Sequence, residues 1–379
     1  MTAPRILLSA GEPSGDLHGA AVARALLVRW PDARLYGLGG PLMEAEGVAL
    51  VAHVDELAVM GLAEVASRLP FFVRLLRAMK RQLRNDPPDL VIPIDYPGFN
   101  LRLAKAARAC GVPVLYYIAP QVWAWHRSRI SELARNTARL AVILPFEEAL
   151  FREAGAQVRF VGHPLLDSEP VTVSREDFAR ALGLDPARPI LALFPGSRVQ
   201  EIARHLVPFS AAAARVVESR PDVQPVVAAG SAIPDDAFGA TPWPRTGLSW
   251  DLLRHASAAL VKSGTSTLQA ALAGTPMVVS YRMHPLTFAV ARRVVRVDHV
   301  ALANLVAGDR VVPELLQTDA TPASLADALL PLLAERSPER ARAIEGLSRV
   351  RTALAATDGE GSAAERVAAL AGELLGRGS

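Results

Sequence analysis

Two short loops of the sequence place glycine beside hydroxyl or basic residues directly after an apolar run. In "PGSR" (195–198), a flexible glycine precedes Arg198, whose guanidinium group can bind a phosphate through two parallel hydrogen bonds. "SGT" (263–265) opens a helical pattern, and the free N–H groups and dipole of a helix start favour an anion. The alternatives are a solvated surface arginine and a simple N-cap formed by Ser263 or Thr265. Together the two loops predict a site for a diphosphate.

Carboxylates also follow apolar runs. Asp95 lies in "IDYPGFN" (94–100), between a strand pattern and a Pro-Gly turn. A carboxylate at the end of a strand is placed where a general base can act, although a turn-forming aspartate is the alternative. In "GEPSGD" (11–16) a turn leads into a helix, and Glu12 and Asp16 are either simple cap charges or part of a site.

The sequence lacks the motifs that are typical of cofactor and metal binding. "GLGGPL" (37–42) fails the dinucleotide pattern, and neither a phosphate-binding P-loop nor a D-x-D motif occurs. His126 and His163 have no partners at metal-ligand spacing, so we expect both to be structural and expect no metal and no cofactor. For Trp123 and Trp125 in "APQVWAWHR", packing is the expected role.

The elements that position these loops alternate between apolar strands and helices. Most strand candidates are apolar along their whole length, which is typical of strands buried on both faces of a parallel sheet. The first half predicts strands at 5–12, 33–40, 89–95, 113–120, 139–145 and 158–164, and helices at 17–29, 100–110 and 146–154. After a lapse at 165–178, the second half predicts strands at 189–198, 223–230, 258–262 and 276–282, and helices at 200–219, 250–256, 265–273 and 286–295.

This repeat predicts an α/β protein with two Rossmann-like, doubly wound domains that face each other across a cleft. The predicted domains are 1–165 and 166–345. A helical tail at 346–379 crosses back to the first domain or swaps with a second chain. Ligands of open parallel sheets bind beyond the carboxyl ends of the strands, where all four loops lie.

Composition narrows the class of protein. The chain has 379 residues with 51% hydrophobic and 21% charged residues, which is ordinary for a globular enzyme. A net charge of +3 does not imply a nucleic-acid partner. Cys110 is the only cysteine, so no intrachain disulfide can form, and packing is its expected role. Because the N-terminus lacks the apolar core of a signal peptide, we expect a cytoplasmic protein.

The segment 68–84 is amphipathic, with six basic residues and no acidic residue. On a helix, one face would carry Phe72, Leu76, Met79 and Leu83, and another would carry Arg74, Arg77, Arg81 and Arg84. This pattern favours a helix that lies on an anionic membrane surface. The alternative is an ordinary helix that packs on its own sheet with a solvated basic face.

Taken together and in this order, the motifs resemble one family. They are "AGEPSGD", "LAVMGLAEV", "IDYPGFN", "APQVWAW", "LPFEE", "FVGHPLLD", "PGSR", "SGTSTLQAAL", "PMVVSYRM" and "LANLVAG". They run from residue 6 to about 320 and resemble the lipid-A-disaccharide synthases, glycosyltransferases of lipopolysaccharide assembly. The tail matches that family only in its helical character.

The resemblance implies a GT-B fold and a metal-independent, inverting transfer. It also implies that domain 1–165 lies on the acceptor and membrane side and that domain 166–345 binds the UDP-sugar. The implied donor is UDP-2,3-diacylglucosamine and the implied acceptor is 2,3-diacylglucosamine 1-phosphate, which give a β-1,6 disaccharide 1-phosphate and UDP. It also implies peripheral association with the cytoplasmic surface of the inner membrane and leaves a homodimer open.

The resemblance assigns roles to residues of this chain. Asp95 would take the proton of the acceptor hydroxyl, and Glu12 would orient the acceptor or assist Asp95. The implied UDP-binding residues are Gly196, Ser197, Arg198, Ser263, Gly264, Thr265, Gln269 and Asn304. The implied acceptor-side residues are Ser14, Gly15, Asp16 and Asn100. The implied membrane-facing residues are Phe71, Phe72, Arg74, Leu75, Leu76 and Arg77.

One position departs from the family pattern. Gln269 stands where the family often has glutamate, so its bond to the ribose hydroxyls would be uncharged and weaker.

Two rival functions remain at this point. One is another GT-B-like enzyme, such as a UDP-N-acetylglucosamine transferase or an epimerase, and the other is a non-catalytic sugar-binding protein.

Overall fold

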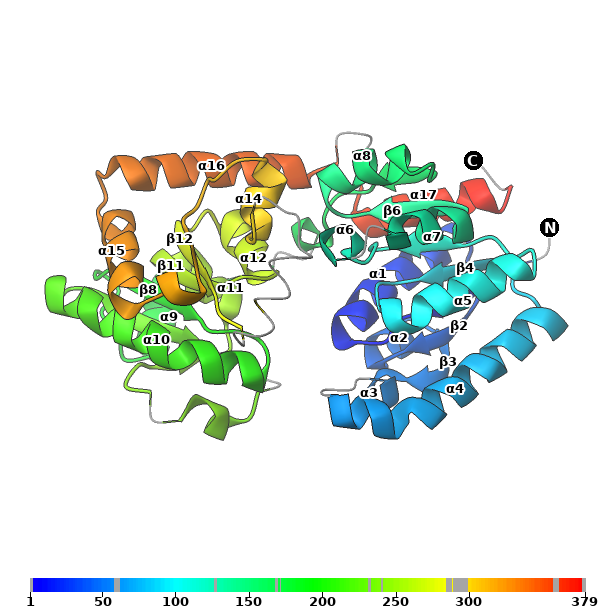
Figure 1. Ribbon diagram of the computed structural model, residues 1–379, viewed down its shortest axis with the longest axis horizontal. Coiled ribbons are helices and arrows are strands. Elements are labelled where there is room, and N and C mark those ends of the chain that lie inside the picture. The colour runs from blue at the N-terminus through cyan, green and yellow to red at the C-terminus, as the bar shows by residue number, and fades with distance from the viewer. Residues whose placement is uncertain are drawn as a thin grey trace. The chain divides into compact units, whose positions relative to one another are not determined.

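The computed structural model describes residues 3–57, 62–125, 128–167, 170, 172–230, 233–239, 241–283, 288, 299–356 and 361–376. The chain divides into two compact units, Met1–Asp167 with Ala356–Ser379 and Ser168–Ala355 (Figure 1). His126, the side chain of Trp125 and the predicted helix at 286–295, apart from residue 288, lie outside what the structure describes.

Unit 1 is built on parallel strands. Four of them form a sheet in the order β3-β2-β1-β4, and three form a sheet in the order β5-β6-β7. Parallel bridges between Val91 and Val114 and between Ile94 and Tyr117 join β4 to β5, so the two sheets continue into each other. The strands are β1 (Arg5–Ser9), β2 (Arg34–Gly39), β3 (Ala49–His53), β4 (Leu90–Pro93), β5 (Leu115–Tyr117), β6 (Arg139–Val142) and β7 (Val158–Phe160).

Helices connect these strands, as a parallel sheet requires. The helices of unit 1 are α1 (Pro13–Arg29), α2 (Pro41–Ala45), α3 (Val54–Leu57), α4 (Leu62–Asn85), α5 (Pro97–Ala109), α6 (Val122–Trp125), α7 (Ser128–Asn136), α8 (Pro145–Glu153), the 3-10 helix η1 (Pro164–Leu166) and α17 (Ala363–Leu374). Several begin with proline in the first turn, where the missing N–H costs nothing.

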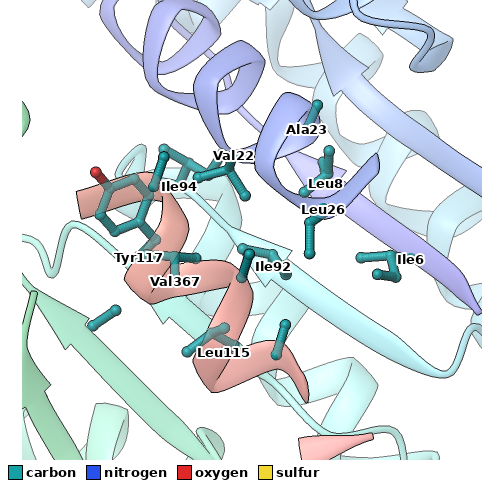
Figure 2. Close-up of a cluster of buried hydrophobic side chains, with 14 of the residues drawn as sticks. Ile6, Leu8, Val22, Ala23, Leu26, Ile92, Ile94, Leu115, Tyr117 and Val367 are labelled. Carbon is teal, nitrogen blue, oxygen red and sulfur yellow. The ribbon is translucent and has the colours of Figure 1, made fainter. Parts of the chain in front are cut away.

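The last helix completes the core of the first unit. Val367 of α17 lies fully buried in one cluster with Val22 and Leu26 of α1 and with Leu115 and Tyr117 of β5 (Figure 2). The helix is fixed at its start, where the backbone N–H of Ala363 donates to Asp167 over 2.7 Å. The predicted tail therefore differs from the structure, because α16 (Pro338–Leu354) stays within unit 2 and only the segment from Ala356 onward belongs to unit 1.

Unit 2 has a single six-stranded parallel sheet in the order β10-β9-β8-β11-β12-β13. Counted within the unit, this is the 3-2-1-4-5-6 order of the Rossmann fold. The strands are β8 (Ile190–Phe194), β9 (Gln224–Ala228), β10 (Arg245–Thr246), β11 (Ala256–Lys262), β12 (Met277–Tyr281) and β13 (Glu314–Leu316). Because β8 and β11 are neighbours at the centre, the loops that follow them, "PGSR" and "SGT", lie side by side at one edge.

The helices of unit 2 are α9 (Arg175–Ala181), α10 (Val199–Ser219), η2 (Asp235–Phe238), α11 (Ser249–His255), α12 (Ser266–Ala273), α14 (Leu302–Ala307), η3 (Gln317–Asp319), α15 (Pro322–Leu333) and α16. Leu193 of β8, Phe209 of α10 and Leu329 of α15 are fully buried in the core of this unit. The two parallel sheets with their covering helices confirm the predicted α/β class. The sequence prediction missed β3, β10 and β13, which are short strands at sheet edges.

Candidate active site

Asp95 follows β4 at the carboxyl edge of the unit 1 sheet, and its backbone is fixed from several sides. Its N–H donates to the carbonyl of Tyr117 over 3.0 Å. Its own carbonyl accepts from the Tyr116 hydroxyl at 2.7 Å and from Asn100 Nδ2 at 2.8 Å. Asp95 and Tyr96 have φ values of +44° and +50°, a strained conformation for residues with side chains. These bonds hold the strained backbone of Asp95 in place.

The Asp95 carboxyl is a stronger base than an ordinary aspartate. Its pKa is raised to about 6, chiefly by burial and secondly by the negative charge of Glu12, while a hydrogen bond from the Tyr96 backbone opposes both. A carboxyl group with this pKa is ionised at neutral pH and still accepts a proton more readily than a solvated one. A raised pKa suits a general base, and this role of Asp95 stays a prediction.

Asn100 is a positioning residue. Its side chain is fully buried, and Nδ2 donates to the carbonyls of Ser9, Ile94 and Asp95. Its Oδ1 accepts from the Ser9 hydroxyl over 2.6 Å. The amide therefore links the end of β1 to the end of β4. The predicted role of Asn100 in binding the acceptor is wrong, because its amide is already hydrogen-bonded inside the fold.

Asp16 is also committed to the fold. Its buried carboxylate accepts the backbone N–H groups of Gly40, Leu42 and Met43 over 2.7, 3.1 and 3.0 Å. These groups belong to the first turn of α2, so Asp16 caps that helix and is not free to meet an acceptor. Of the other predicted acceptor-side residues, Ser14 is exposed and Gly15 packs against Ala10.

Glu12 is exposed at the start of α1, and its side chain accepts no capping hydrogen bond from that helix. The neighbouring Gly11 lets the ring of Tyr96 lie against the backbone, because a Cβ atom at this position would overlap the ring. The Tyr96 hydroxyl donates to the carbonyl of Leu57 over 3.0 Å. The loop before α1 and the Asp95 loop are thus packed directly on each other.

Trp123 has the predicted packing role, with one polar contact. Its buried ring lies edge-on to Phe146 at 5.0 Å, and its Nε1 donates to Glu147 Oε1 over 3.0 Å. Burial raises the pKa of Glu147 to about 7, against the opposing effect of that hydrogen bond. His163 is buried, and its Nδ1 accepts from the N–H of Leu165, so its role is structural as predicted.

In unit 2, the "PGSR" loop turns sharply from β8 into α10. Gly196 has a φ of +139°, and a Cβ atom there would overlap the side chain of Glu201. The N–H of Ser197 donates to Glu201 Oε2 over 3.0 Å. Arg198 is exposed as the N-cap residue of α10. The loop therefore presents an exposed cation beside a helix start.

The "SGT" loop leaves backbone donors open at the start of α12. The Ser263 hydroxyl donates to the carbonyl of Val300, and Thr265 makes no side-chain cap bond. Neither residue is therefore the simple helix cap that the sequence allowed. Across the described residues, the N–H groups of Gly264, Thr265 and Ser266 have no hydrogen-bond partner. Three free donors at a helix start favour an anion, and the phosphate-binding role of this loop stays a prediction.

Two further residues were predicted to bind the nucleotide. Gln269 lies half-buried on α12, within the first turns of that helix. Asn304 is fully buried, and its Nδ2 donates to the Val312 carbonyl and to Glu314. Its Oδ1 accepts the N–H groups of Val311 and Val312. All the hydrogen-bonding capacity of Asn304 is used inside the fold, so a direct bond to a nucleotide is not available to it.

The sequence prediction missed a charged pair at the carboxyl edge of the unit 2 sheet. Lys262, the last residue of β11, lies 2.7 Å from Glu201 of α10. The signal was present in the sequence, because Lys262 directly precedes "SGT" and Glu201 lies three residues after Arg198.

A polar cavity of about 570 Å³ opens at the same edge of the sheet, beyond β9 and β10. It is lined by Ala229, Gly230, Ile233, Asp235, Arg245, Thr246 and Gly247. Across the described ranges, no three His, Cys, Asp or Glu side chains come together as a metal site would require.

Helix α4 packs on unit 1 through the row Leu75, Met79 and Leu83, which are at most 8% exposed. The prediction that Leu75 faces a membrane is therefore wrong, and Met79 and Leu83 do not share an outer face with Phe72. Residues four apart lie on the same face of a helix, and this face packs against the core of unit 1. Phe71, Phe72 and Leu76 are half-buried, whereas Arg74 and Arg77 are exposed. In the part of the chain that the structure describes, no helix combines the length and apolar character needed to cross a membrane.

Comparison with known sequences supports one family. A family model described as lipid-A-disaccharide synthetase matches residues 6–359. The chain is 42% identical to the lipid-A-disaccharide synthase of Geobacter metallireducens, with 99% of each chain covered. It is 43% identical to the lipid-A-disaccharide synthase of Syntrophus aciditrophicus, again with 99% of each chain covered.

Comparison with solved structures bears on the fold alone. The calicheamicin glycosyltransferase CalG4 aligns with a TM-score of 0.62 at 20% identity, covering 100% of this chain and 99% of its own. A UDP-N-acetylglucosamine 2-epimerase from Neisseria meningitidis aligns with a TM-score of 0.62 at 10% identity, covering 99% of each chain. Transferases and epimerases thus share this fold, and the sequence family distinguishes between them. The chain belongs to the lipid-A-disaccharide synthase family and is a GT-B glycosyltransferase.

Proposed function

We propose that this enzyme transfers the sugar of UDP-2,3-diacylglucosamine to the 6-hydroxyl of 2,3-diacylglucosamine 1-phosphate. The products are the β-1,6-linked disaccharide 1-phosphate and UDP. Membership of the family supports a UDP-sugar donor and a sugar-phosphate acceptor, and the names of the relatives support a lipid A disaccharide as product. The acyl chains on both substrates are part of the proposal.

The donor half of the proposed site lies at the carboxyl edge of the unit 2 sheet. The diphosphate binds to the free N–H groups at the start of α12 and to the guanidinium group of Arg198. The polar cavity beyond β9 and β10 takes the uracil base. Donors that are fixed before the reaction stabilise the negative charge that the leaving UDP gains.

The acceptor half is carried by Asp95. The acceptor O6 attacks the anomeric carbon and loses its proton to the Asp95 carboxylate. The bond from the anomeric carbon to the phosphate oxygen breaks, and its electron pair leaves with UDP. One displacement from the side opposite UDP inverts the configuration. The observation that supports this most strongly is the constrained backbone of Asp95 together with a carboxyl pKa of about 6.

The test is a reaction with defined substrates. The enzyme is incubated with UDP-2,3-diacylglucosamine and 2,3-diacylglucosamine 1-phosphate, and the products are analysed by mass spectrometry and NMR. We expect one UDP for each disaccharide 1-phosphate and a β linkage. Consumption of the UDP-sugar without acceptor, or its conversion to an epimer, would favour the epimerase alternative.

We further propose that α4 rests on an anionic membrane surface. Phe71 and Phe72 stack edge-to-face at 5.6 Å near the start of the exposed stretch, and Arg74 and Arg77 follow. Apolar side chains beside arginines suit the boundary between acyl chains and anionic headgroups.

Replacing Phe72 and Leu76 together by serine should reduce co-sedimentation with vesicles that contain anionic lipid. Val28→Ser with Val207→Ser is the matched control, because these valines are 81% and 74% exposed on other helices. Equal pelleting of both double variants would contradict the membrane role of α4.

A further inference from the structure

Lys262 lies next to the proposed anion site of unit 2. It is the last residue of β11, directly before Ser263 and Gly264. A Cβ atom built on Gly264 would lie 3.6 Å from the Lys262 Nζ. The ammonium group therefore lies beside the backbone that carries the free N–H groups of α12.

The side chain of Lys262 is held by two contacts. Its Nζ donates to Glu201 Oε1 over 2.7 Å and lies 5.4 Å from the centre of the Tyr281 ring. The Lys262 and Glu201 side chains are 16% and 21% exposed. An ammonium group has three N–H donors, and the bond to Glu201 uses one of them.

Glu201 links this lysine to the "PGSR" loop. Its Oε2 accepts the N–H of Ser197 over 3.0 Å, so the same carboxylate touches both loops at this edge of the sheet. Burial alone would raise the pKa of Glu201, but the hydrogen bond and charge of Lys262 lower it overall. Glu201 is thus an ionised partner that fixes where Lys262 points.

This placement gives the anion site a cation of a different kind from Arg198. Arg198 is exposed, so its charge is screened by solvent until a ligand covers it. Lys262 is mostly buried and already oriented, and a charge in such a position interacts more strongly with a bound anion.

We infer that Lys262 is a further ligand of the donor diphosphate, held ready by Glu201, and that it stabilises UDP as the leaving group. The inference rests on the proposed function, since it takes the diphosphate of a UDP-sugar as the anion. As the bond to the anomeric carbon breaks, the phosphate oxygen nearest that carbon gains negative charge. A nearby ammonium group stabilises that charge, so Lys262 contributes to the rate as well as to binding.

The test compares ligands that differ in phosphate number. Calorimetry is carried out with UDP and with uridine on the wild-type protein and on Lys262→Met. We expect UDP affinity to fall by about 10- to 100-fold in the variant, because a charged hydrogen bond is lost. Uridine affinity should stay within about twofold, and Lys262→Arg should restore most of the loss.

A double variant separates a direct contact from mere neutralisation of Glu201. Lys262→Met combined with Glu201→Gln removes both charges and leaves no unpaired carboxylate. If UDP still binds as weakly as in Lys262→Met, the direct contact holds. Wild-type UDP affinity in the double variant would overturn it, as would unchanged affinity in Lys262→Met.

Failure of the proposed function would show differently, as absence of UDP binding in the wild-type protein.

Chemical labelling gives a second readout. The chain has three lysines, and Lys80 and Lys105 are exposed in unit 1. Saturating UDP should protect Lys262 from an amine-specific reagent while these two lysines react as before, as read by mass spectrometry. Equal modification of Lys262 with and without UDP would contradict the inference.

Discussion

At the scale of single residues, the proposed chemistry depends on the protonation of Asp95. Burial contributes most to its raised pKa of about 6, and Glu12 adds a second, electrostatic contribution. Since a general base must be ionised, activity should fall as the pH drops through this value. At pH 5 only about a tenth of the molecules would carry the ionised carboxyl, given a pKa of about 6.

Glu12→Gln tests the electrostatic contribution. Removing the negative charge lowers the pKa of Asp95, so the acid limb of kcat/KM should move to lower pH. The pH profile of kcat/KM between pH 4.5 and 8 measures this shift. Glu148→Gln, an exchange of the same kind on α8, serves as the control and should leave the limb in place. An unmoved limb in Glu12→Gln would show that this charge does not act on the base.

Residue type alone could predict only part of the site. Asp95 and Arg198 were predicted as site residues because each follows an apolar strand, where ligands of parallel sheets bind. Asn100 and Asn304 were predicted to bind ligands, yet the side-chain amides of both form hydrogen bonds with backbone groups inside the fold. An amide suits a loop closure as well as a ligand, and sequence spacing does not distinguish the two. Lys262 was missed although it directly precedes "SGT", because only the fold brings it to Glu201, which lies 61 residues away in the chain.

At the scale of elements, two loops position the base jointly. The loop before α1 meets the loop after β4 where Gly11 lies under the ring of Tyr96. Tyr96 adopts a left-handed backbone conformation directly after Asp95, so a shift of its ring is transmitted to the carboxyl. The glycine is required by this close approach.

Gly11→Ala should therefore displace Tyr96 and misplace the base. We expect kcat to fall by about tenfold or more, since small displacements of catalytic groups are costly. Gly98→Ala is the matched control in the same region, because a Cβ atom there would meet nothing within 4 Å. Steady-state kinetics on both variants give the comparison. A Gly11→Ala enzyme as active as Gly98→Ala would contradict this coupling between the loops.

Helix α4 shows where pattern reading fails at this scale. Its amphipathic character was predictable, but its start at Leu62 and the direction of its apolar stripe were not. Leu75, Met79 and Leu83 turn toward the protein, because burial in the fold competes with any surface for the same side chains. Only the packing of the helix decides which apolar residues remain for a partner.

At the scale of the whole molecule, the chain returns to its first unit at the end. The segment after Ala356 belongs to unit 1, and α17 supplies buried side chains to its core (Figure 2). The alternating pattern predicted both sheets, since buried parallel strands are apolar along their length. It could not predict the destination of the last helix, because an Ala- and Leu-rich helix suits any apolar surface.

Leu370→Ala should destabilise the protein by about 2 to 5 kcal/mol, the usual cost of a buried leucine. Leu370 is 2% exposed in the unit 1 core. Ile344→Ala is the control, because Ile344 is 41% exposed on α16 and should cost little. Denaturant unfolding of both variants measures the difference. Equal stability of the two variants would show that α17 contributes little to unit 1.

The central claim is that Asp95 is the base of a sugar transfer from UDP, and Asp95→Asn tests it most directly. Asparagine tolerates the left-handed backbone conformation of this position, so the fold should be kept. The measurement pairs disaccharide formation in a single turnover with UDP binding by calorimetry. We predict transfer at least about 100-fold slower, with UDP affinity unchanged. Transfer near the wild-type rate, with UDP bound as before, would contradict the account.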